Sequence, residues 1–115
     1  MDLQQYQMIA KQAANPDLTR QAALSSWSLG LLTKAGLVEQ HVKDHLSLGA
    51  PLSPSLLMDR LGELILNYVM LVEELNLSTH QILIRNLATL HAQYFESYGS
   101  YQREQTRVLE LVNSE

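Results

Sequence analysis

Residues 53–75, SPSLLMDRLGELILNYVMLVEEL, decide the fold of this chain. Ser53 can cap the free amide groups of a first helical turn, and Pro54 fits the first helical position because its missing N–H would have no partner there. The segment that follows has apolar residues on more than one side of the predicted helix: Leu57, Leu61, Leu64, Ile65, Tyr68, Val69, Val72 and Leu75. A central helix or an interface helix has this pattern.

Two helices are predicted before this segment. The first spans residues 3–14 and ends at Asn15-Pro16, and the second spans residues 18–48 and ends at Gly49. The apolar residues of the second recur at helical spacing, and we expect them to form part of the core: Leu24, Trp27, Leu31, Ala35, Val38 and Val42.

Two further helices are predicted after it. Ser78 and Gln81 form a capping-box pattern at the start of a helix that should end near Ser97. We expect this helix to bury one face, made of Leu83, Leu87, Leu90 and Tyr94. A last helix, over residues 100–112, has a short apolar stripe that starts at Val108.

No run of alternating β-branched or aromatic residues is long enough to predict a sheet. We therefore predict an all-α protein, an antiparallel bundle of four to five helices. In this prediction residues 3–98 form the helical domain and residues 99–115 form a C-terminal helix or tail.

The composition bears on partners and location. Apolar residues make up 46% of the chain and charged residues only 17%, so we expect part of the surface to be covered in a homodimer or a tetramer. A net charge of −4, with 8 Lys and Arg that form no run, argues against nucleic acid and anionic membranes as partners. The chain has no cysteine. With no signal-peptide pattern and no long apolar stretch, we expect a cytoplasmic protein.

Three blocks of sequence carry a family resemblance. Residues 29–39 are LGLLTKAGLVE, residues 57–64 are LMDRLGEL, and residues 86–94 are NLATLHAQY. With Tyr6-Gln7 and Asn15-Pro16 before them, their order and spacing over residues 3–98 resemble the MazG-like family of all-α nucleotide pyrophosphohydrolases. The resemblance implies a MazG-like helical bundle.

Members of that family cleave nucleoside triphosphates to a monophosphate and pyrophosphate, with magnesium held by four acidic residues spaced E-x-x-E and E-x-x-D. The matching positions of this chain carry Lys34, Leu37, Arg60 and Glu63. The side-chain charge there changes from about −4 to about +1, which repels a divalent cation. We therefore expect no magnesium and no other cofactor, and a direct ion pair from Lys34 or Arg60 to Glu63 in a partly dry cleft.

Other uses of these residues stay open at this point. Lys34 and Arg60 could bind a nucleotide or other anion without metal, and Asn86 and Tyr94 match the polar ligand-pocket positions of the family. Alternatively, a rearranged metal site could use Glu63, Asp59 and His41, with Glu39 nearby. His41 and His45 stand one helical turn apart, a spacing that can hold zinc but that more often marks surface or interface residues.

These observations lead to two hypotheses about function. The first is a MazG-like protein with a degraded magnesium site, a pseudoenzyme that acts as a binding or regulatory helical dimer. The alternative is a metal-dependent nucleoside triphosphate pyrophosphohydrolase with a rearranged site, in which case magnesium would be the cofactor.

Overall fold

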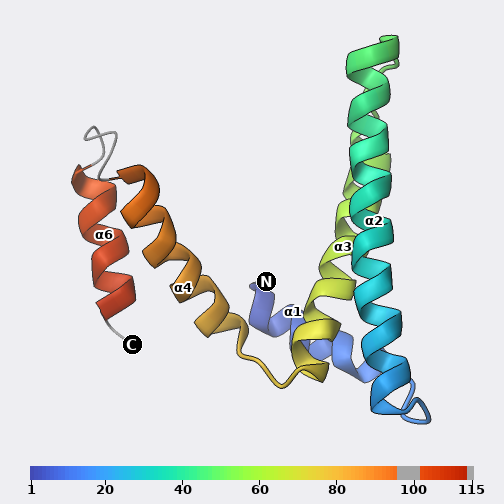
Figure 1. The fold of residues 1–115 in the computed structure, drawn as a ribbon, viewed down its shortest axis with the longest axis horizontal. Coiled ribbons are helices and arrows are strands. Elements are labelled where there is room, and N and C mark those ends of the chain that lie inside the picture. The colour runs from blue at the N-terminus through green and yellow to red at the C-terminus, as the bar shows by residue number, and fades with distance from the viewer. Residues whose placement is uncertain (96–101, 114–115) are drawn as a thin grey trace. The chain divides into compact units, whose positions relative to one another are not determined.

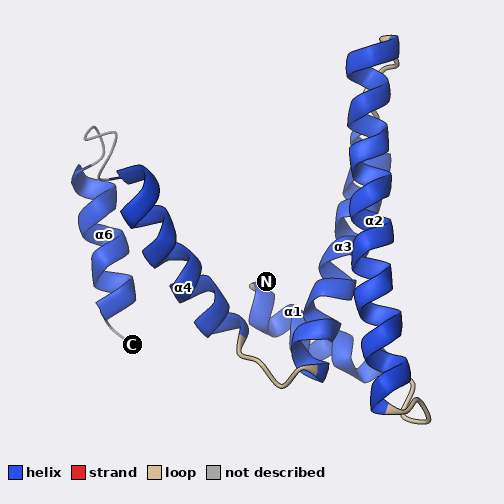
Figure 2. Ribbon diagram, in the orientation of Figure 1, coloured by secondary structure: helices blue, strands red, loops and turns tan. Residues whose placement is uncertain are grey.

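The computed structural model describes residues 1–95 and 102–113, and all regular secondary structure within them is helical (Figures 1 and 2). This confirms the predicted all-α class. The α-helices are α1 (Leu3–Ala10), α2 (Arg20–Leu48), α3 (Pro54–Glu74), α4 (Thr79–Leu90) and α6 (Gln102–Asn113). A 3-10 helix, η1 (Lys11–Ala13), follows α1, and a π-helix, η2 (His91–Phe95), follows α4. None of the described helices combines the length and apolar character that crossing a membrane requires.

Side-chain caps fix where the helices begin. Ser53 accepts a hydrogen bond from the amide of Leu56, and Pro54 opens α3, as the sequence predicts. Ser78 accepts from the amide of Gln81 at the start of α4. The predicted end of that helix near Ser97 and the predicted start of the last helix at Ser100 lie outside the described residues.

The chain divides into two compact units, residues 1–76 and residues 77–115. In the first unit α2 and α3 run antiparallel as a hairpin, and α1 packs beside α3 (Figure 1). In the second unit α4 packs with α6. The division predicted from the sequence, residues 3–98 and 99–115, stays a prediction.

The core of the first unit lies between α1 and α3. Val69 is fully buried, with 0% of its surface exposed, and packs with Ala10 and Met70. Tyr6 and Trp27 cover this cluster. Val69 and Val72 are buried within the chain and Tyr68 is half-buried, and the expectation that this helix lies in or beside an interface between copies stays a prediction.

The stripe expected to bury the second helix is only partly covered. Trp27 and Leu31 are half-buried, whereas Ala35 and Val42 are exposed. On α4, Ile84 is buried, and of the predicted face Leu87 and Leu90 are half-buried whereas Leu83 is exposed. Val108, the first residue of the stripe predicted on the last helix, is buried.

At Gly30, α2 lies so close to α3 that no room is left for a side chain. A Cβ added to Gly30 would lie 2.0 Å from Oδ1 and 2.7 Å from Cγ of Asn67. Asn67 is buried and donates from Nδ2 to the carbonyl of Glu63 at 2.8 Å, so its side chain cannot easily move away. Gly36, on the same helix, has open space where its Cβ would be.

We predict opposite effects of alanine at these two glycines. Gly30→Ala should lower the free energy of unfolding by ~1–3 kcal/mol, because the new methyl group overlaps Asn67. Gly36→Ala should raise it by ~0.5–1 kcal/mol, because alanine favours the helix and meets nothing. Urea denaturation of both variants measures the difference. Equal stability of the two would contradict the close α2–α3 approach.

Candidate functional site

Of the four residues that stand at the positions of the MazG-like metal site in the resemblance, Lys34 and Glu63 contact each other across the α2–α3 hairpin. Lys34 Nζ on α2 lies 2.9 Å from Oε2 of Glu63 on α3. The ion pair expected between one of the two cations and Glu63 is therefore present, and Lys34 is the cation that forms it. An ammonium group thus lies against the one carboxylate among the four positions.

The other two positions contact each other in a different way. Arg60 donates from an Nη atom to the backbone carbonyl of Leu37 at 3.5 Å. The contact is long, and it uses the main chain of Leu37 rather than a charged side chain. Arg60 and Leu37 are both half-buried, so this pair packs the hairpin.

The ion pair of Lys34 with Glu63 is more exposed to solvent than the sequence predicted. The Lys34 side chain is 31% exposed and that of Glu63 is 50% exposed. We expected a partly dry cleft with a buried pair, and this was wrong for the protomer because nothing in residues 1–76 covers Glu63 on its outer side. An ion pair in such a place contributes ~0–1 kcal/mol rather than the several kcal/mol of a buried pair.

This arrangement does not fit magnesium as the family pattern would hold it. Magnesium takes oxygen ligands in octahedral geometry, and the four matching positions offer only the carboxylate of Glu63, whose Oε2 already accepts from Lys34. Among the side chains that the structure describes, those of residues 1–93 and 107–113, no three His, Asp or Glu gather in a way that could hold a metal ion. The rearranged set of Glu63, Asp59 and His41 is not brought together in the described part of the chain.

The histidine pair holds the loop between α2 and α3. His41 Nε2 accepts a hydrogen bond of 3.0 Å from the backbone amide of Ser53, and His45 Nδ1 lies 2.7 Å from the carbonyl oxygen of Ala50, to which it donates. Both rings are half-buried. The sequence left a metal role for His41 open, but here its Nε2 is occupied by the residue that caps α3.

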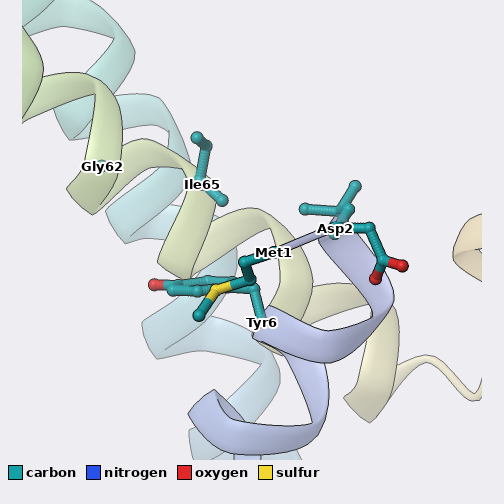
Figure 3. A pocket seen from close by; sticks show the side chains of 6 residues that line it. Met1, Asp2, Tyr6, Gly62 and Ile65 are labelled. Carbon is teal, nitrogen blue, oxygen red and sulfur yellow. The ribbon is translucent and has the colours of Figure 1, made fainter.

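A shallow groove lies between α1 and α3, next to the ion pair. Figure 3 shows its apolar part, a pocket of about 240 Å³ around Tyr6, Gly62 and Ile65. A neighbouring pocket of about 480 Å³ shares Tyr6 and Gly62 and is also lined by Asp59 and Glu63. The groove therefore offers apolar surface and carboxylates, which do not suit a polyphosphate without metal.

The remaining candidate residues lie in the second unit. Asn86 is on α4 and is exposed. Tyr94 is in η2, and its side chain lies outside the described part of the structure. Their role as a ligand pocket stays a prediction.

Sequence reasoning missed Asn67, which connects the two sides of the hairpin through its contact with Gly30 and its bond to the carbonyl of Glu63. A signal was available. An amide between Leu66 and Tyr68 in an otherwise apolar stretch, combined with a glycine in the middle of the preceding helix, indicates a close helix contact.

Comparison with models of protein families, with curated proteins and with solved structures finds no match to this chain. Function therefore has to be argued from the site itself.

We predict that Lys34→Ala lowers the free energy of unfolding by no more than ~1 kcal/mol, because the pair with Glu63 is solvent-exposed. The effect should shrink in 1 M salt, which screens exposed charges. Lys11→Ala, at the longer 4.0 Å pair with Glu73, is the matched control and should cost no more. A loss of ~3–5 kcal/mol on Lys34→Ala would show that the pair is buried in the protein in solution.

Proposed function

We propose that this chain is a non-catalytic helical protein of the MazG-like type, which self-associates and acts by binding rather than by hydrolysing nucleotides. The observation that carries the proposal is the position of the Lys34 ammonium, 2.9 Å from the Glu63 carboxylate. A cation lies where the resemblance implies a metal ion, and it uses the one acidic ligand that the four positions retain.

The chemistry of phosphate transfer supports this proposal. Cleavage of a nucleoside triphosphate needs neutralisation of the leaving pyrophosphate and activation of a water molecule, and magnesium supplies both. Arg60 and Lys34 could in principle neutralise phosphate directly. However, Lys34 is paired with Glu63 and Arg60 points to a main-chain carbonyl, so neither cation is directed at the groove beside Tyr6.

Self-association is the second part of the proposal, and the exposed apolar surface supports it. Large apolar side chains on both helices of the hairpin are well exposed, including Leu29, Leu32, Met58 and Leu61. Exposed apolar surface of this extent is typical of proteins that bind other polypeptides.

We predict no magnesium- or manganese-dependent release of pyrophosphate from any common nucleoside triphosphate. A coupled pyrophosphate assay over the four ribonucleotides and four deoxyribonucleotides tests this, with Glu63→Ala as the control for contamination. Metal-dependent turnover that Glu63→Ala abolishes would overturn the non-catalytic proposal and favour the rearranged enzyme.

A gain-of-binding variant tests the same idea without catalysis. Lys34→Glu combined with Arg60→Glu restores three carboxylates among the four positions and removes both cations. This variant should bind magnesium in calorimetry where the wild-type chain does not, and it should be less stable than wild type in the absence of metal, because like charges then face each other. If neither the variant nor the wild-type chain binds magnesium, these four positions do not converge as the resemblance implies.

A further inference from the structure

The start of α3 depends on an interaction with another helix. In a capping box, the side chain of the N-cap residue binds the amide of the third helical residue, and the side chain of that third residue binds the amide of the N-cap residue in return. α3 has the first half of this arrangement, because Ser53 Oγ accepts from the amide of Leu56 at 3.4 Å. The apolar side chain of Leu56 cannot supply the second half.

His41 of α2 supplies the missing half. Its Nε2 accepts a hydrogen bond of 3.0 Å from the amide of Ser53, the group that a glutamate or glutamine at position 56 would otherwise bind. α3 is therefore capped jointly by its own serine and by an imidazole that stands 12 residues earlier in the chain.

The bond from Ser53 to His41 exists only in the neutral form of the ring. Nε2 accepts through a lone pair, and a proton bound there turns the acceptor into a donor. The charged ring would then face the Ser53 N–H and the free amides at the N-terminus of α3, where the helix dipole also disfavours a positive charge. Uptake of a proton by His41 must therefore break the bond to Ser53.

The second histidine that holds this loop responds to acid in the opposite way. His45 Nδ1 donates to the carbonyl of Ala50 at 2.7 Å, and a protonated ring still carries a proton on Nδ1. His45 also lies in the last turn of α2, where the helix dipole favours a positive charge. Acid therefore leaves the bond between α2 and Ala50 in place.

We infer that His41 is an acid-sensitive cap that releases the start of α3 as the pH falls. Below ~pH 6, near the range in which a free imidazole takes up its proton, the loop of residues 49–53 leaves α3 at Ser53 and stays bound to α2 at Ala50. His41 is the switch, and the first turn of α3 is the element that it controls.

The direction of the effect on stability follows from proton binding. The folded chain must give up the bond to Ser53 before His41 binds a proton, whereas the unfolded chain has no such bond. The unfolded state therefore binds the proton more readily. The contribution of this cap to the free energy of unfolding is present at neutral pH and is lost as the pH falls.

Charged groups around the ring act on it in opposite directions. On α2 they are Asp44 and His45, one helical turn after His41. On α3 the charged group is Arg60, whose guanidinium contacts a main-chain carbonyl one turn before His41. Asp44 favours a charged ring, whereas Arg60 and a protonated His45 disfavour it. Residues 49–53 include no charged side chain, and the cluster that α1 covers begins ~24 Å further along α3.

Hydrogen exchange followed by NMR on the whole chain, from neutral pH to about pH 5, tests the inference. The protection factor of the Ser53 amide, which corrects for the intrinsic effect of pH on exchange, should fall ~10-fold or more, because a helix cap contributes about that much. The Leu56 amide should lose protection with it. A protection factor of the Ser53 amide that stays constant over this range would overturn the inference.

His41→Gln and His45→Asn separate the two rings. Glutamine places an oxygen acceptor near the position of Nε2 and does not titrate, so the Ser53 amide of His41→Gln should keep its protection in acid. Asparagine keeps a donor near the position of Nδ1, so His45→Asn is the matched control and should lose protection at Ser53 as the wild type does. A loss that persists in His41→Gln would overturn the assignment of the switch to His41.

The ring of His41 gives a readout that needs no substitution. Its nitrogen chemical shifts at neutral pH should show the proton on Nδ1 and the lone pair on Nε2. A proton on Nε2 at neutral pH would exclude the bond to Ser53 and would overturn the switch, whether or not the variants fold.

Discussion

The ion pair of Lys34 with Glu63 belongs to a line of polar contacts on which the α2–α3 hairpin is built. In most helix pairs the residues at the closest contact are apolar and form the core. Here that line carries an ammonium, a carboxylate, a guanidinium, an amide and an imidazole, and a glycine provides the closest approach. The apolar residues are displaced to the two sides of the line. α1 covers one side on α3, where Val69 and Met70 are buried, and the apolar residues of the other side are only partly buried by residues 1–76.

Both proposals follow from this one constraint. A line of contacts that satisfies its own charges offers no set of oxygen ligands for a metal ion, so the catalytic role that the family resemblance implies loses its chemical basis. The same line ends at His41, where an imidazole that can take up a proton holds the residue that caps α3. In this account Lys34 and Arg60 are structural residues of the hairpin. They join the two helices through charged groups that remain in contact with water.

The sequence predicts local features of this structure better than it predicts burial. The start of α3 depends only on Ser53 and Pro54, and the pairing of Lys34 with Glu63 depends only on two helices facing each other, so both follow from residues and spacing. Burial depends on where other segments pack. The apolar stripe that contains Val69 fits either a central helix or an interface helix, and it is α1 that buries Val69 within the chain, a contact that no pattern in residues 3–10 specifies. The histidine bonds to the 49–53 loop were not predictable either, since they depend on the path of that loop.

The measurement that tests the central claim most directly is an NOE experiment on the protein in solution, which detects protons of α2 and α3 that lie close together. The account predicts NOEs from the Hα protons of Gly30 to the side-chain amide of Asn67. It also predicts NOEs from the ring of His41 to the amide of Ser53. NOEs from Gly30 to leucine methyl groups of α3, with none to Asn67, would contradict the claim that a line of polar contacts joins the two helices.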